Sequence, residues 1–212
     1  MLRSTRPGDE WISLLDSGLR TVLADVPATR PSPATTEPET ELAEAERQTS
    51  CALMRVNHAG EISAQALYTG QSLLARSATT RQLLLQAAAE EQDHLAWCAA
   101  RLDDLGGRRS LLGPFWYLGS LAIGVLVSSS GDRTSLGFVA ETEKQVEAHL
   151  DDHIARLPAR DLKSRAVLTQ MAADEAHHGT MAELAGGGQL PSLVRKLMGV
   201  GGVILRRIAF FV

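Results

Sequence analysis

The stretch AAAEEQDHLA, residues 87–96, decides the fold. It is an alanine-rich helical run with leucines on either side, yet it carries three acidic residues and a histidine. Glu91 and His94 are three residues apart, so they lie on one face of a helix. That face is otherwise apolar, with Leu84, Ala87 and Cys98. Because unpaired polar groups are costly in a core, Glu91 and His94 predict a bound ligand.

The same spacing recurs in ADEAHHGTM, residues 173–181, where two pairs fit. Asp174 with His177 lies on a face of mixed polarity, and an aspartate reaches less far than a glutamate. Glu175 with His178 lies on an otherwise apolar face. We therefore choose Glu175 and His178 and keep His177 in reserve.

Each of these motifs follows, about 30 residues later, a glutamate in phase with an apolar helical stripe: Glu61 and Glu143. Four carboxylates and two neutral imidazoles nearly balance two divalent ions, and this ligand set is that of di-iron and di-manganese helical bundles. Iron is favoured over zinc because mixed carboxylate–imidazole sites with open positions suit redox-active iron and dioxygen. Ligand type alone leaves manganese open.

Helical periodicity accounts for most of the chain, and no useful run of alternating polarity occurs, so we expect an all-α protein. Four long helices are predicted over residues 41–76, 80–105, 134–157 and 160–185, and the last three end at glycine or proline. The predicted organisation has three parts: residues 1–40, an amphipathic helix (9–24) and a flexible linker; residues 41–188, the bundle; and residues 189–212, a basic amphipathic segment.

Two segments break the soluble pattern. Residues 110–131 contain no charge, but a proline and several glycines make them a poor spanning helix. They predict either a buried hairpin or a segment lying in a bilayer. After Glu183 the chain has four basic residues and no acidic one, although its net charge is −4. A basic apolar tail on an acidic body favours a membrane surface over nucleic acid, so we expect peripheral membrane contact.

Length and composition agree with this interpretation. A chain of 212 residues fits one domain, and 44% apolar with only 4% aromatic residues favours helices packed through small and branched side chains. Cys51 and Cys98, the only cysteines, are expected to be buried thiols in a reducing compartment. With no secretory signal visible, we expect a cytosol-facing bacterial protein.

Three blocks, RVNHAGEISAQALYTGQ (55–71), EEQDHL (90–95) and DEAHHGTM (174–181), resemble the demethoxyubiquinone hydroxylase family. The resemblance runs from about residue 45 to the C-terminus. It implies a ferritin-like four-helix bundle with an added apolar hairpin and a C-terminal amphipathic helix. It also implies two Fe ions with six ligands: Glu61, Glu91, His94, Glu143, Glu175 and His178. One departure is Asn57, where the family often has aspartate.

The activity implied by the resemblance is O2-dependent hydroxylation of 2-polyprenyl-3-methyl-6-methoxy-1,4-benzoquinol in ubiquinone biosynthesis. The enzyme would lie peripherally on the cytoplasmic face of the bacterial inner membrane, where the polyprenyl tail resides. The reductant and the prenyl length are not encoded in any motif. A homo-oligomer or a ubiquinone-biosynthesis assembly stays open.

Other residues near the motifs allow two interpretations each. His58 and His149 are packing or surface histidines, or they deliver protons. Tyr68 either hydrogen-bonds a ligand or fills the core, and His153 is expected at the surface. Three aromatic residues are candidates for contact with the substrate tail or for plain packing: Trp97, Trp116 and Tyr117.

Three rival functions are weighed. Iron storage or ferroxidase activity predicts a cage-forming soluble surface, which the apolar segment and basic tail do not fit. A different di-iron hydroxylase or a desaturase would share the ligand set. A metal-free membrane adaptor gives no reason for two Glu-x-x-His motifs on buried stripes.

Overall fold

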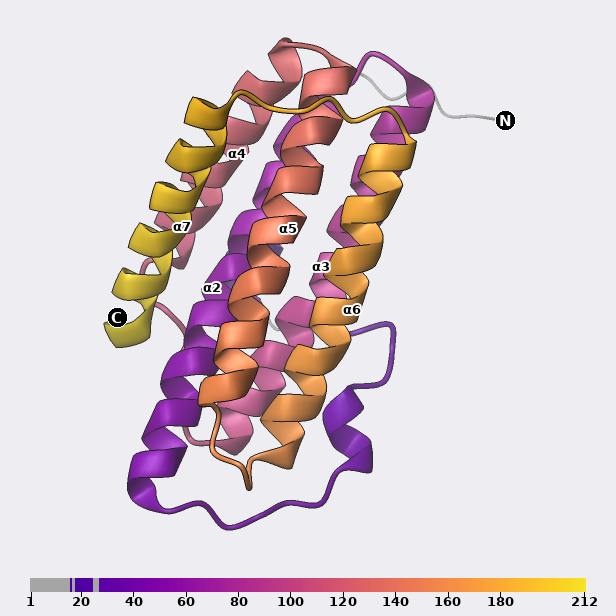
Figure 1. Cartoon of the computed structure of the whole chain (residues 1–212). Helices are drawn as coiled ribbons and strands as arrows, with labels where there is room; N and C mark the ends of the chain where they lie inside the picture. Colours follow the sequence, from indigo (N-terminus) through magenta and orange to yellow (C-terminus); the bar gives the residue numbers. More distant parts are fainter. Residues whose placement is uncertain (1–15, 17, 25–26) are drawn as a thin grey trace.

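A computed structural model describes residue 16, residues 18–24 and residues 27–212 of the chain (Figure 1). Within these residues there are helices and loops but no strand, so the all-α prediction is confirmed. The elements are η1 (Pro33–Thr36), α2 (Glu44–Leu73), α3 (Ala78–Asp104), α4 (Gly113–Ser129), α5 (Asp132–Arg156), α6 (Leu162–Leu184) and α7 (Ser192–Phe211). Each of the four predicted bundle helices begins and ends within three residues of its expected bounds.

Local sequence signals fix the helix ends. The Ser77 side chain accepts a hydrogen bond from an amide in the first turn of α3, and Asp161 does the same for α6. Gly106 and Gly186 follow the ends of α3 and α6 with φ of 63° and 100°, a left-handed conformation that favours glycine. These glycines are the predicted helix stops.

The bundle consists of two helix pairs, α2 with α3 and α5 with α6, and α3 also contacts α6. Two apolar clusters fill its interior. The first is built around Leu53, Met54, Cys98, Leu150, Leu168 and Met171. The second contains Leu67, Tyr68, Leu84, Ala87, Val139 and Ala182. On each helix the candidate ligands come between the residues of these two clusters in sequence. Cys51 and Cys98 are free and buried, as expected.

The uncharged segment forms one continuous helix, α4, which corrects the expectation of a hairpin. It packs on α2 (Figure 1), and glycines lie on both sides of the contact. A Cβ added to Gly70 would collide with the Leu121 carbonyl, and one added to Gly124 would collide with the Leu67 carbonyl. The two backbones can therefore approach closely only because neither residue has a side chain. No helix in the described part of the chain is long and apolar enough to cross a membrane.

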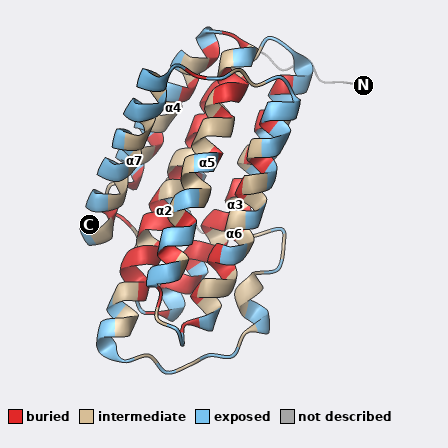
Figure 2. Ribbon diagram, viewed as in Figure 1, coloured by how far each residue is buried: buried red, intermediate tan, exposed pale blue. Residues whose placement is uncertain are grey.

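The basic tail forms α7, which packs on α2 and α5 beside the bundle (Figure 1). Arg55 donates a 2.7 Å hydrogen bond to the Phe210 carbonyl, so a cation from α2 satisfies the C-terminal end of α7. Figure 2 shows exposed residues along the outer side of α7. Large exposed apolar side chains lie on α4 and α7: Phe115, Leu118, Ile123, Leu126, Leu193, Leu197, Val200, Val203, Ile204, Ile208 and Phe211.

Residues 27–43, which we call the strap, do not form the flexible linker expected from their composition. Two alanines of the strap pack against the first apolar cluster, and η1 contacts α6. Glu39 pairs with Lys163 at 2.8 Å and with buried Arg101 at 3.3 Å. Short alanines and single polar anchors hold the strap where the composition offers little to bury. Of the predicted helix over 9–24, residues 16 and 18–23 are helical, and residues 9–15 and 17 lie outside the described residues.

Candidate metal centre

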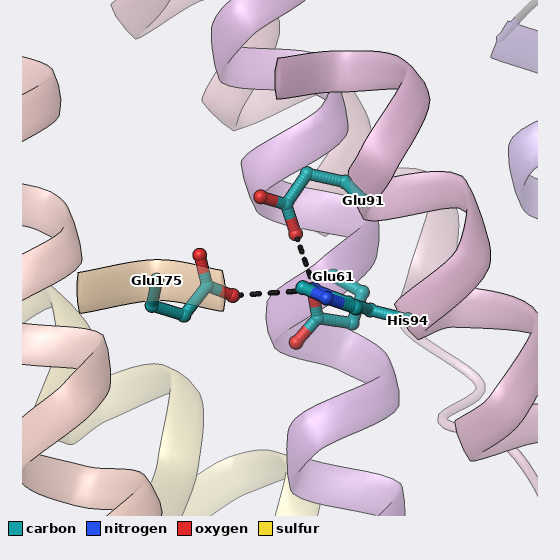
Figure 3. Close-up of side chains that lie close together, drawn as sticks. All are labelled: Glu61, Glu91, His94 and Glu175. Atoms are coloured by element: carbon teal, nitrogen blue, oxygen red, sulfur yellow. Dashed lines mark hydrogen bonds and ion pairs between the residues drawn. The ribbon is translucent and has the colours of Figure 1, made fainter. Parts of the chain in front are cut away.

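All six predicted ligands come together in the middle of the bundle, each at most 7% exposed. They form two overlapping groups whose potential ligand atoms lie within 4.8 Å of one another. The groups are Glu61, Glu91, His94 and Glu175, shown in Figure 3, and Glu91, Glu143, Glu175 and His178. The pair that helical phase selected on α6 belongs to these groups, whereas Asp174 and His177 belong to neither.

Glu91 and Glu175 are shared by both groups. His94 Nδ1 lies 3.3 Å from an oxygen of each of them. His178 Nδ1 lies 3.1 Å from the other oxygen of Glu175 and 3.4 Å from the other oxygen of Glu91. Each of these two carboxylates thus divides its oxygens between the histidines. Each of the other two glutamates lies near one histidine and not the other. An oxygen of Glu61 is 3.7 Å from His94 Nδ1, and an oxygen of Glu143 is 3.9 Å from His178 Nδ1.

The outer nitrogen of each histidine meets a further carboxylate. His94 Nε2 donates to Asp174 Oδ2 at 2.9 Å, and His178 Nε2 donates to Glu90 Oε2 at 2.7 Å. Neither partner was predicted from the sequence, because the contacts cross between α3 and α6. A signal was nevertheless present: an acidic residue directly precedes the glutamate of each motif, and it binds the histidine of the other motif.

The protonation equilibria show how much negative charge the cluster carries. Burial raises the pKa of Glu61 and of Glu143 well above the ordinary value, and neighbouring carboxylates add to it. At Glu91, hydrogen bonds from His178 and His94 outweigh burial and lower the pKa.

The imidazoles respond in the opposite sense. Burial would lower the pKa of both rings, but hydrogen bonds to the surrounding carboxylates prevail. For His94 these are led by Asp174 and Glu175, and they raise its pKa well above the ordinary value. For His178 they are led by Glu175 and Glu91, and they raise its pKa to about 12. The centre therefore stabilises positive charge strongly.

Tyr68, predicted either to hydrogen-bond a ligand or to fill the core, is fully buried and donates a hydrogen bond to Glu143 Oε1. It thus contacts one of the six residues directly. Two carboxylate oxygens of the cluster, Glu61 Oε2 and Glu91 Oε1, are buried and poorly satisfied, because the nearest imidazole nitrogens lie 3.7 and 3.4 Å away. Such oxygens are costly unless a cation binds them.

The other predicted histidines lie outside both groups. His58 is buried and lines a cavity of about 410 Å³ together with Leu95 and Trp97. The His149 ring packs against His153, with 5.1 Å between centroids. The surface assignment of His153 was wrong, because it is 2% exposed and its Nδ1 donates to Asn57 Oδ1 at 2.9 Å. Asn57, the departure from the family pattern, is thus used to pair a buried histidine.

Three aromatic side chains were candidates for substrate contact. Trp97 is buried with its ring centroid 5.5 Å from that of His94, so it packs beside the centre. Tyr117 is buried against α2 in a small apolar cluster, and Trp116 packs on the same cluster. In this structure all three have packing partners within the protein.

The sequence of this chain is similar to those of known proteins. A family model described as "Ubiquinone biosynthesis protein COQ7" matches residues 48–205. A protein of Nitrosomonas europaea named 3-demethoxyubiquinol 3-hydroxylase is 53% identical over 204 residues, covering 96% of this chain and 98% of that protein. Proteins of the same name from Burkholderia ambifaria and Aromatoleum aromaticum are 52% and 53% identical, covering 96% and 90% of this chain and 98% and 92% of their own lengths.

Proposed function

Because the chain belongs to the ubiquinone biosynthesis family COQ7, we propose that its buried carboxylate–histidine cluster holds two iron ions that serve O2-dependent hydroxylation of a polyprenyl benzoquinol. The family is ferritin-like, in agreement with the all-α bundle. The chain is a hydroxylating oxidoreductase of ubiquinone biosynthesis, given its relatives at 50–53% identity over nearly its whole length. The comparisons give no support to iron storage.

The residues present fit a pair of divalent cations. Glu61 Oε2 and Glu91 Oε1 are buried acceptors with only distant donors, and both imidazoles aim Nδ1 at carboxylates. In the protein alone, the raised pKa values of the histidines and of Glu61 and Glu143 favour the protonated forms, which offset this negative charge. Two dications would replace those protons, with Glu91 and Glu175 shared between them.

Ferrous ions held by these six residues would supply electrons for the reduction of O2. The protein itself positions the ligand side chains and excludes water from the centre. Tyr68 fixes the orientation of Glu143, and Asp174 and Glu90 fix the two imidazoles so that Nδ1 faces inward. The apolar clusters on either side keep water from the centre, which protects a reactive oxidant from side reactions.

We further propose that α4 and α7 rest on the cytoplasmic face of the bacterial inner membrane, from which the quinol reaches the enzyme. Support comes from the large apolar side chains that both helices expose beside α2. Basic residues flank those of α7, namely Arg195, Lys196, Arg206 and Arg207. An amphipathic helix with this pattern lies in the interface plane and is attracted to anionic lipid.

The observation that carries the function is the sharing of Glu91 and Glu175 between the two histidines, so these residues are the test. Each Glu→Ala variant should lose hydroxylation of a short-chain demethoxyquinol and should retain much less than the roughly two irons per chain expected of the wild type. Iron is measured after anaerobic reconstitution. Glu147→Ala, one helical turn from Glu143 but outside both groups, is the matched control and should retain iron. Unchanged iron content in both ligand variants would contradict the assignment.

A further inference from the structure

The strap reaches the metal centre at one point. The Thr29 amide donates to Asp93 Oδ1 at 2.6 Å, and Arg30 Nε donates to Asp93 Oδ2 at 2.8 Å. Asp93 is 2% exposed, so these bonds fix the strap on α3. The guanidinium of Arg30 then lies over the Trp97 ring, 4.8 Å from its centroid, and the Trp97 indole donates to the Arg30 carbonyl.

From this position Arg30 touches the outer partner of a histidine. Arg30 Nη1 lies 2.9 Å from Asp174 Oδ2, the same oxygen that accepts from His94 Nε2. One guanidinium therefore joins Asp93 on α3 to Asp174 on α6. Trp97 contacts both Arg30 and His94, since the Arg30 guanidinium lies over its ring and the His94 ring packs beside it. The His94 imidazole is thereby held through Asp174 and along its ring face.

The second histidine has a different environment. His178 Nε2 also donates to a carboxylate, but Glu90 is 32% exposed, and it accepts a further hydrogen bond from the neutral amide of Gln86. Glu90 lines a small cavity with His177 and Met181. The two groups of candidate ligands are thus alike in their inner residues and unlike in what supports them from outside.

We propose that Arg30 is a positioning residue for the metal site that contains His94: by fixing Asp174 it keeps His94 Nδ1 aimed at Glu61, Glu91 and Glu175. This inference rests on the proposed metal centre and adds to it a role for the strap and an inequivalence between the two metal positions. Arg30 lies before the residues matched by the family model.

Positioning and simple electrostatics predict opposite results. A fixed positive charge near a metal site repels the metal, so if Arg30 acted only through its charge, its removal would strengthen binding. If Arg30 positions Asp174, its removal weakens binding, because the imidazole loses its fixed orientation. Lysine keeps the charge but cannot bridge two carboxylates with a planar fork, so Arg30→Lys separates the two effects.

The experiment is a titration of the metal-free full-length protein with Co²⁺, followed by its visible ligand-field bands and by calorimetry. Wild type is expected to bind two ions. Asp174→Asn should weaken one binding step by roughly 10- to 100-fold, as is common when the outer partner of a histidine ligand is lost. Arg30→Gln and Arg30→Lys should weaken the same step several-fold and leave the other step unchanged.

Glu39→Gln is the matched control, because it loosens the strap at Arg101 and Lys163 without touching Asp174. It should bind both ions as wild type does. Wild-type affinity in both Arg30 variants, or tighter binding in Arg30→Gln, overturns the inference and leaves the metal centre intact. Weakening in the Glu39 variant equal to that in the Arg30 variants also overturns it. A wild-type protein that binds no Co²⁺ refutes the proposed function itself.

Discussion

The proposed contact of α7 with a membrane leads to a quantitative prediction. Leu197 and Ile204 are seven residues apart on one helical face, 63% and 50% exposed. Full burial of such a side chain contributes about 1.5–3 kcal/mol, so burying the part still exposed contributes about 1 kcal/mol each. Replacing both by serine should therefore weaken membrane binding by about 2 kcal/mol, or roughly thirtyfold in partition coefficient.

The assay is sedimentation with vesicles of phosphatidylethanolamine and phosphatidylglycerol over a range of lipid concentrations. The matched control replaces two exposed leucines elsewhere, Leu85 on α3 and Leu184 at the end of α6, which are 50% and 78% exposed. This double serine variant removes similar apolar surface and should bind vesicles like wild type. Equal binding by all three proteins, or equal loss in both variants, would refute the assignment of α7 to the membrane.

Two further predictions concern stability. Gly124→Ala should destabilise the fold by about 1–3 kcal/mol, because the new Cβ meets the α2 backbone. Gly119→Ala, on the open side of α4, should be neutral or stabilising by up to about 1 kcal/mol, and urea unfolding midpoints measure both effects. Burial lowers the pKa of His149 to about 4 and of His153 to about 3. The unfolded chain therefore binds protons first, so stability should fall as pH drops below about 6.5, by up to about 1.4 kcal/mol per pH unit and group, and His153→Gln should flatten that slope; an unchanged slope would contradict the assigned burial.

Most of the bundle was predictable because the apolar residues and the candidate ligands follow the same 3.6-residue repeat. The repeat that places apolar residues inward also places Glu61, Glu91, Glu143 and Glu175 inward. A wrong choice of helix face would therefore have placed charged residues along the apolar stripe. Gly106 and Gly186 gave the helix ends for a local reason, since few other residues adopt their backbone conformation.

What escaped prediction depends on contacts between distant segments. The strap has the composition of a linker, and only the partners of Arg30 and Glu39 on α3 and α6 reveal that it is held. His153 looked like a surface residue because its partner, Asn57, is on another helix. The roles of Glu90 and Asp174 likewise arise from the pairing of α3 with α6, which helical phase within one segment does not contain.

The glycine contact between α4 and α2 fixes the spacing between these two helices. With no side chain between the two backbones at Gly70 and Gly124, nothing there can compress or reorient, so α4 and α2 move as one body. Glu61 is carried by α2, two to three turns from Gly70. If α4 rests on the bilayer as proposed, this contact would act as a fixed spacer. It would set the height of the centre above the lipid, and a quinol ring would travel about one helix diameter before it reached Glu61.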